Sequence, residues 1–188
     1  VITTGDPNGI GAEITIKALN LLNLPSKDIV LVSNSKILNS YGVLNNNYEI
    51  VELKEKTIVG FAGRTSNDDP KMGAVISELW QKLYTPENVS GTRNRVNTYA
   101  IGLYSDYEKE GYQVTAGFEV SKACALEGQV TKVIPAGKYA KFQIHGDYVE
   151  AVSNAWSEIW NTPLDRTYTG DFEEYRTMED IDIYIAIR

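Results

Sequence analysis

Aromatic and acidic side chains lie next to one another near the C-terminal end of the sequence, in the stretch whose residue types are best suited to binding chemistry. This stretch reads Phe172, Glu173, Glu174, Tyr175. As a strand, it would hold a carboxylate between aromatic rings, on a sheet that also presents Tyr184. Because ring faces and a poorly solvated carboxylate both attract an organic cation, the pattern predicts a pocket for a cationic or amphipathic molecule. The alternative is a half-exposed strand on which acidic and aromatic residues alternate without a ligand.

The run that follows, residues 181–187, alternates strictly. Isoleucine stands at every second position, with Asp182, Tyr184 and Ala186 between. Strand side chains point alternately to the two faces of a sheet. The run therefore predicts a strand with one core face, formed by the isoleucines, and a second face that presents Tyr184.

The composition excludes several classes of function. The 188 residues carry a formal charge of −7 with a pI of about 4.8, and their Lys and Arg residues form no cluster, so a nucleic-acid surface is not expected. No apolar run approaches the roughly 18 residues of a membrane helix. The single cysteine, Cys124, cannot form an internal disulfide. We expect a cytoplasmic protein without a nucleic-acid or membrane partner, and a homodimer is compatible with the sequence.

Residues 1–46 predict a short βαβ piece. Strands are expected at 1–4 and 28–33, with a glycine-rich turn and a helix at 12–22 between them. Residues 2–14, ITTGDPNGIGAEI, resemble the N-terminal signature of the 4-hydroxythreonine-4-phosphate dehydrogenases. That resemblance implies an NAD cofactor and histidine ligands for a metal. Because the only histidine, His145, lies outside the matching part, we carry over neither a metal site nor a cofactor.

Residues 47–188 predict a second domain, of the α+β class. The expected order strand, strand, helix, strand, strand in residues 48–120 recurs in residues 130–187. The two expected helices also end alike, at residues 80–86 and 156–163, each with a tryptophan at its start and a proline at its end. We infer a duplicated ββαββ unit that forms one antiparallel sheet with two helices on one face. This arrangement leaves the other face of the sheet, or the groove between the halves, free for a ligand.

Four phrases of this domain, in this order, resemble the gyrase-inhibitor-like effector-binding domains. They are residues 112–120, 134–140, 171–175 and 181–187. The resemblance implies a pseudo-twofold domain in which a central glutamate reads the positive charge of a ligand, and the acidic phrase places that role on Glu173. The family includes ligand-sensing parts of transcription regulators, stand-alone binders and some hydrolases. The helix-turn-helix domain of a regulator is not visible in the sequence.

The sequence therefore predicts a small-molecule binding module without a catalytic residue, metal ligand or cofactor. The expected ligand-binding residues are Glu173, Tyr175, Phe172, Tyr184, Tyr104, Glu119 and Trp160. Tyr99 or Tyr139 could take the place of Tyr104, because the pattern leaves the phase of that strand open. Two other hypotheses stand beside this one. The first is an enzyme, either a hydrolase that uses Glu173 with a tyrosine or a dehydrogenase-related N-terminal piece; the second is an interaction protein that acts through its acidic surface.

Overall fold

The computed structural model describes residues 2–3, 15, 18, 31–32, 48–146 and 148–188. The chain divides into two compact units, residues 1–49 and 50–188. In the first unit, β1 (Ile2–Thr3) and β2 (Leu31–Val32) pair in parallel. Parallel pairing is what a strand–helix–strand connection produces, but the predicted glycine-rich turn and nearly all of the predicted helix lie outside the described residues. The division of the chain at residue 46 stays a prediction.

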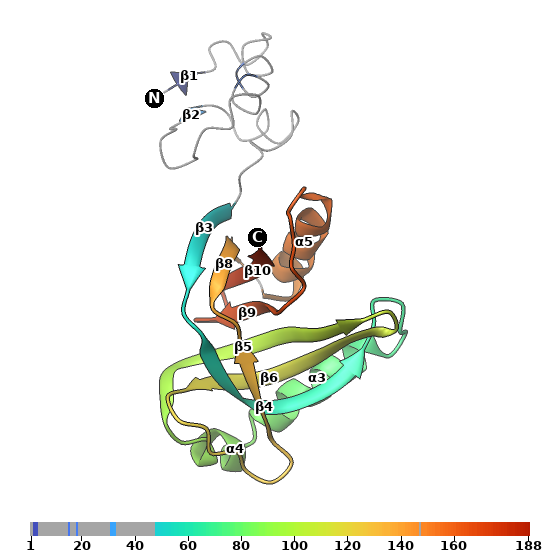
Figure 1. Cartoon of the computed structure of the whole chain (residues 1–188), viewed down its shortest axis with the longest axis vertical. Helices are drawn as coiled ribbons and strands as arrows, with labels where there is room; N and C mark the ends of the chain where they lie inside the picture. The colour runs from blue at the N-terminus through green and yellow to red at the C-terminus, as the bar shows by residue number, and fades with distance from the viewer. Residues whose placement is uncertain (1, 4–14, 16–17, 19–30, 33–47, 147) are drawn as a thin grey trace. The chain divides into compact units, whose positions relative to one another are not determined.

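The second unit is built on one eight-stranded sheet with the order β3-β8-β10-β9-β5-β6-β4-β7 (Figure 1). Its strands are β3 (Tyr48–Leu53), β4 (Lys56–Thr65), β5 (Arg95–Glu108), β6 (Gly111–Val120), β7 (Val130–Ile134), β8 (Gly137–His145), β9 (Asp171–Tyr175) and β10 (Asp180–Ile187). The described strand pairs of this sheet are antiparallel. The predicted α+β class with an antiparallel sheet is confirmed.

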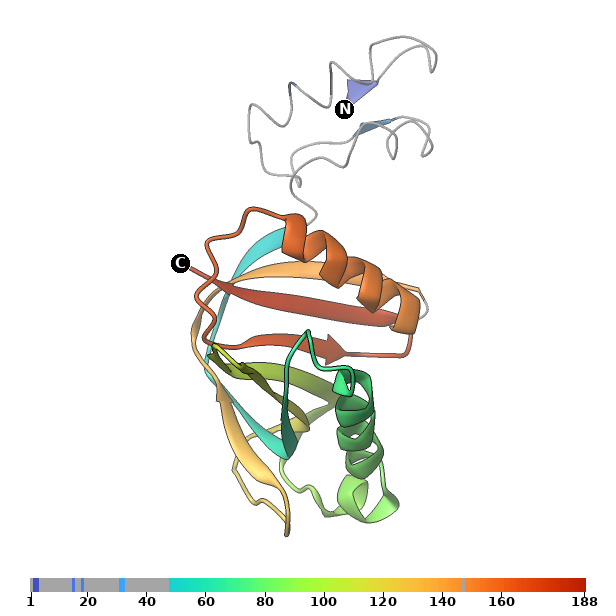
Figure 2. The ribbon, with the colours of Figure 1, turned by 90° about the vertical axis from the view of Figure 1, so that its right-hand side faces the viewer.

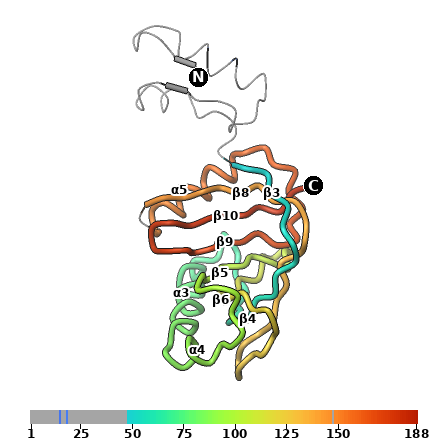
Figure 3. Tube along the Cα trace, turned by 90° about the vertical axis from the view of Figure 1, so that its left-hand side faces the viewer, coloured from blue at the N-terminus to red at the C-terminus, as the bar shows by residue number. Residues whose placement is uncertain are grey.

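The strand order has a near-twofold pattern. Along the chain, β3 and β4 precede α3 (Met72–Leu83) and are followed by β5 and β6; β7 and β8 precede α5 (Tyr148–Asn161) and are followed by β9 and β10. In the sheet, β9 and β5 are neighbours at the centre (Figure 3). The edge strands are β3 and β7. The first strand of each half therefore pairs with the second strand of the other half: β3 lies beside β8, and β7 lies beside β4. A short extra helix, α4 (Pro86–Gly91), departs from the pattern, and an origin in duplication stays a prediction.

Both long helices cover the same face of the sheet (Figure 2). In α3, Leu79 and Leu83 are buried, and in α5 Ala155 and Ile159 are buried, which are helical spacings of one apolar stripe. The stripe of α3 packs in a cluster with Ala100, Val114, Ala116 and Phe118 of β5 and β6. None of the helices among the described residues is long and apolar enough to cross a membrane.

The opposite face of the sheet carries a second core. Its buried members are Ile58, Ile101, Leu103, Ile134, Tyr139, Phe172, Tyr184 and Ala186, with Val51 and Leu53 packed against them. Because β3 and β7 are the two edges of the sheet and both contribute to this cluster, the sheet must curve until its ends share one core. Both faces of β10 are consequently buried. The expectation that β10 has a single core face is wrong, since the curvature covers the face that holds Tyr184.

We expect residues 48–188 to fold without the preceding segment, because all the described strands of the eight-stranded sheet and all the described residues of both cores lie within them. A shortened chain that begins at Tyr48 should keep the circular dichroism spectrum and cooperative thermal unfolding of this unit. A matched chain that begins at Lys56 also loses β3, and with it the packing of Val51 and Leu53. It should be less stable than the first, by at most about 2 kcal/mol for each of these two partly buried side chains, since that value applies to full burial. An unfolded chain from Tyr48 would contradict the division into two units.

Candidate ligand-binding site

The floor of the candidate site is the central strand β9, whose side chains alternate between the two cores. Phe172 lies in the core of the face away from the helices. Glu173 pairs with Gly102 of β5 and points to the opposite face, where it meets Trp156 of α5. By the same alternation, Asp171 and Tyr175 share the helix-covered face with Glu173. One strand thus presents two carboxylates and a tyrosine to the space beneath the helices.

Glu173 is buried, with 3% of its surface exposed. Its Oε1 accepts hydrogen bonds from Trp156 Nε1 at 2.6 Å and from the Tyr104 hydroxyl at 3.0 Å, and its Oε2 accepts one from the Tyr175 hydroxyl at 2.7 Å. All three donors are uncharged. Burial raises the pKa of Glu173 above its ordinary value of 4.5, and the three hydrogen bonds offset part of that rise because they favour the ionised form.

The two tyrosines remain donors at neutral pH. Burial first, and then the nearby charge of Glu173, raises the pKa of Tyr104 and of Tyr175 well above the ordinary value of 10.0. Their hydroxyl groups therefore stay protonated while Glu173 is ionised. The carboxylate is held in place by hydrogen bonds, but its negative charge is not neutralised by them.

Gly102 makes room for this arrangement. A Cβ atom at this position would lie 3.1 Å from Oε2 of Glu173 and 3.2 Å from Cζ2 of Trp80. Both distances are shorter than ordinary van der Waals contact, so a larger residue would push the carboxylate or the indole aside. Trp80 also meets Tyr175 edge to face, with ring centroids 5.1 Å apart. The glycine lets α3 and β9 approach each other across β5.

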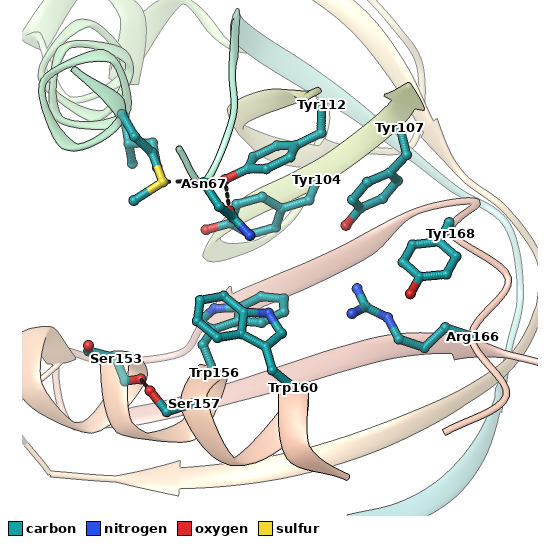
Figure 4. Close-up of a pocket in the computed structure, with 12 residues that line it drawn as sticks. Asn67, Tyr104, Tyr107, Tyr112, Ser153, Trp156, Ser157, Trp160, Arg166 and Tyr168 are labelled. Atoms are coloured by element: carbon teal, nitrogen blue, oxygen red, sulfur yellow. Dashed lines mark hydrogen bonds between the residues drawn. The ribbon is translucent and has the colours of Figure 1, made fainter. Parts of the chain in front are cut away.

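A cavity of about 460 Å³ opens above these groups, between α3, α5 and the hairpin of β5 and β6 (Figure 4). Its lining residues are Asn67, Met72, Ile76, Tyr104, Tyr107, Tyr112, Ser153, Trp156, Ser157, Trp160, Arg166 and Tyr168. Figure 4 shows the tyrosines of β5 and β6 on one side and the indoles of α5 on the other. Glu173 is not part of the lining, but two of its three partners, Tyr104 and Trp156, are.

The rings around the cavity contact one another in a continuous series. Tyr104 meets Trp156 edge to face with centroids 5.3 Å apart, and Trp156 lies 6.3 Å from Trp160. On the other side, Tyr112 lies 5.8 Å from both Tyr104 and Tyr107. Such a wall offers ring faces and edges to a guest, and ring faces attract cations.

Three of the predicted site residues gather with Glu173, and three do not. Tyr104 and Tyr175 bind its carboxylate, and Trp160, with 58% of its surface exposed, lines the cavity. Phe172 and Tyr184 instead stack on each other in the opposite core, with centroids 4.4 Å apart, and Glu119 forms an ion pair with Lys56. The expectation that Phe172 and Tyr184 face the groove with Glu173 is wrong, because neighbouring strand residues point to opposite faces. Of the alternatives to Tyr104, Tyr139 is also in the opposite core.

The structure adds residues that the sequence pattern did not predict. Trp156 stands one helical turn before Trp160, and this spacing was the available signal that both face one way. Tyr107 and Tyr112 flank the hairpin turn between β5 and β6. Arg166 and Tyr168 belong to the irregular segment between α5 and β9, where no periodicity indicates which side chains point inward. Among the described residues, no group of His, Cys, Asp or Glu side chains is arranged to hold a metal ion.

A family model, Cass2, described as integron-associated effector binding protein, matches residues 49–187, and the chain belongs to this family. The region that the family model matches begins after residues 2–14, which resemble the dehydrogenases. The family model therefore gives no support to that resemblance. No curated protein gives a significant match to the chain.

Solved structures share this fold. An integron cassette protein from the mobile metagenome of Vibrio cholerae is 30% identical, with a TM-score of 0.63 over 75% of this chain and 95% of that one. A protein named SAV2435, solved bound to tetraphenylphosphonium, is 15% identical, with a TM-score of 0.63 over 75% of this chain and 93% of that one. A putative transcription regulation protein from Staphylococcus aureus MU50 is 15% identical, with a TM-score of 0.61 over 75% and 97% of the two chains. The two likenesses at 15% identity show the fold alone.

Proposed function

We propose that residues 48–188 bind a hydrophobic organic cation in the aromatic cavity, with Glu173 as its counter-charge and without catalysis. Membership of an effector-binding family supports a small-molecule ligand. The chemistry of the cavity supports a cation in particular. Its walls are largely aromatic, and the carboxylate directly behind Tyr104 and Trp156 carries a negative charge into a poorly solvated place.

Glu173 differs from the other buried carboxylates of this unit in its partners, and this difference is the strongest support for a cationic ligand. Among the described residues of this unit, four carboxylates are buried: Asp171, Glu173, Glu174 and Asp182. Asp171 pairs with Arg166, Glu174 with Lys56, and Asp182 with both Lys141 and Arg176. Within the described part of the chain, Glu173 alone among the four has no cationic partner. A buried charge without a partner is costly, and a bound cation would offset part of that cost.

The position of the aromatic rings explains how such a cation would be recognised. Tyr104 and Trp156 each use a polar edge to bind Glu173, while their rings border the cavity. A cation lying against these rings gains from their faces and from the nearby carboxylate together. A lipophilic cation also buries apolar surface of its own, since most of the lining is aromatic or aliphatic. The same part of the cavity would therefore recognise both the positive charge and the apolar surface of the ligand.

We expect the affinity for a permanent cation to fall as the pH is lowered through the pKa of Glu173. That pKa is raised in the empty protein, so the carboxyl group takes up a proton at a higher pH than an ordinary glutamate. The cation favours the ionised form, and below that pKa its affinity should fall by up to about tenfold per pH unit. The measurement is a fluorescence titration of Trp156 and Trp160 with tetraphenylphosphonium from roughly pH 8 down to roughly pH 4, within the range where the protein stays folded.

Tetraphenylborate serves as the matched probe, because it has nearly the same size and shape as tetraphenylphosphonium and the opposite charge. We expect no measurable binding of the borate at neutral pH, since it would lie next to the ionised Glu173. In the Glu173→Gln variant, the affinity for the phosphonium should no longer depend on pH in this range. Equal affinities for the two probes, or a flat pH profile in the wild type, would refute the proposed role of the carboxylate.

A further inference from the structure

The second carboxylate on the cavity side of β9, Asp171, is fully buried and lies two residues before Glu173. Its Oδ1 accepts a hydrogen bond from the backbone N–H of Ala186 at 2.8 Å. Its Oδ2 accepts one from the Tyr107 hydroxyl at 2.8 Å and forms an ion pair with the guanidinium of Arg166. Tyr107 and Arg166 both line the cavity. The cavity therefore has a second polar group besides the one at Glu173.

The guanidinium of Arg166 is held in a fixed position at this second group. Asp171 binds it on one side, and the ring of Tyr168 covers it at 4.6 Å. Tyr168 itself has a φ of 55°, a left-handed conformation that non-glycine residues adopt rarely and that costs free energy. In Figure 4, Arg166 reaches into the cavity toward the indole of Trp160. Its Nε is buried and has no hydrogen-bond partner among the described residues.

Asp171 and Glu173 thus play different electrostatic roles. Asp171 is neutralised by Arg166, so that end of the cavity is neutral overall and offers guanidinium N–H groups that Asp171 does not use. Glu173 has only uncharged partners, so its end of the cavity is negative whenever Glu173 is ionised. The two carboxylate residues are separated by two strand positions, roughly 7 Å. One end of the cavity is suited to a cation and the other to a hydrogen-bond acceptor.

We propose that the ligand is an organic cation that also carries an uncharged hydrogen-bond acceptor, such as an amide or ester carbonyl, which Arg166 binds while Glu173 balances the positive charge. This inference rests on the proposed function and specifies the ligand class of the same site. The acceptor should be uncharged, because Asp171 already balances Arg166. A carboxylate at that position would add a negative charge next to Asp171 and Glu173, and losing its own hydration would be costly.

The test compares three triphenylphosphonium probes that differ only at the end of one arm. The arms are pentyl, 4-carboxybutyl, and the primary amide of the latter. By calorimetry at neutral pH, we expect the wild type to bind the amide arm about fivefold to tenfold more tightly than the pentyl arm, the scale of one hydrogen bond to a charged group after the cost of desolvating the amide. The carboxylate arm should bind no more tightly than the pentyl arm.

A double variant, Arg166→Met with Asp171→Asn, removes the donors without leaving an unpaired charge. Its ratio of amide to pentyl affinity should fall to about one. The matched control is Arg188→Met with Asp165→Asn, an exposed ion pair at 2.8 Å that does not line the cavity, and it should keep the wild-type ratio. Circular dichroism checks that both double variants fold. If the variant with Arg166→Met and Asp171→Asn does not fold, the order of the three probe affinities in the wild type still tests the proposal.

The outcomes separate this inference from the proposed function. Glu173-dependent binding of the pentyl arm with no preference for the amide would overturn the inference alone, as would a carboxylate arm that binds most tightly. A preference that survives in Arg166→Met with Asp171→Asn would also overturn it. Failure of the wild type to bind any of the three probes would overturn both proposals.

Discussion

Replacing Phe172 with alanine is expected to lower the free energy of unfolding by about 3–5 kcal/mol, the usual cost of emptying a buried aromatic site. Phe172 is fully buried, stacks on Tyr184 with centroids 4.4 Å apart, and meets Tyr139 edge to face at 5.8 Å. These contacts join β8, β9 and β10 in the core of the curved face. Urea unfolding monitored by circular dichroism measures the loss, and Phe172→Leu should show a smaller one.

The Phe172→Ala variant also tests which side chains of β9 point toward the cavity. Because Phe172 points away from the cavity, Phe172→Ala should bind tetraphenylphosphonium like the wild type under conditions where it remains folded. Met178→Ala is the control for stability, since Met178 is 61% exposed and its removal should change the free energy of unfolding by less than about 0.5 kcal/mol. A folded Phe172→Ala variant that has lost cation binding would place the ring in the cavity and contradict the register of β9.

The largest expected effect on binding is that of Glu173→Gln. The amide keeps the shape of the side chain but removes the charge, so a cationic ligand should bind more weakly by about 1.5–3 kcal/mol, roughly tenfold to more than a hundredfold. An equilibrium titration of tetraphenylphosphonium, followed by tryptophan fluorescence, measures this change. Trp156 donates to Glu173 and Trp160 lies beside it, so both fluorophores report on the cavity.

The empty Glu173→Gln protein should be at least as stable as the wild type at neutral pH. The pKa of Glu173 is raised by folding, so the folded protein holds the proton more tightly than the unfolded chain. The stability of the wild type therefore falls as the pH rises from the ordinary glutamate pKa through the folded-state pKa, and the glutamine variant lacks this loss. Urea unfolding at neutral pH and at about pH 4 should show the advantage of the variant shrinking at the lower pH. A variant clearly less stable at neutral pH would contradict the view that this charge is costly.

Much of the architecture could be predicted from local sequence patterns. The alternation of residues 181–187 and the helical stripe that contains Leu79 and Leu83 correspond to β10 and α3. The second buried face of β10 could not be predicted in this way. Asp182 and Tyr184 look like residues of an exposed face, and they are buried because strands distant in sequence curve around them; Asp182 is kept there by Lys141 and Arg176.

The candidate site could likewise be predicted only in part from the sequence. Glu173 stands out in the sequence because it lies among aromatic residues, and strand alternation alone separates it from Phe172. The partners that define its environment come from other elements. Trp156 belongs to α5 and Tyr104 to β5, 69 positions away from Glu173 in the chain. Arg166 lies in an irregular segment, so no periodic pattern could connect it with Asp171.

We expect the unpaired charge of Glu173, and not acidity in general, to attract the ligand. Glu174 provides the comparison within the same strand, because it is also buried but points to the opposite face and pairs with Lys56 at 3.6 Å. The most direct test is calorimetric titration of tetraphenylphosphonium into the wild type, Glu173→Gln and Glu174→Gln at neutral pH. We expect at least a tenfold loss of affinity in Glu173→Gln, the lower end of a charged interaction, and wild-type affinity in folded Glu174→Gln. Unchanged affinity in Glu173→Gln together with lost binding in Glu174→Gln would contradict this expectation, and would assign the site to the other carboxylate.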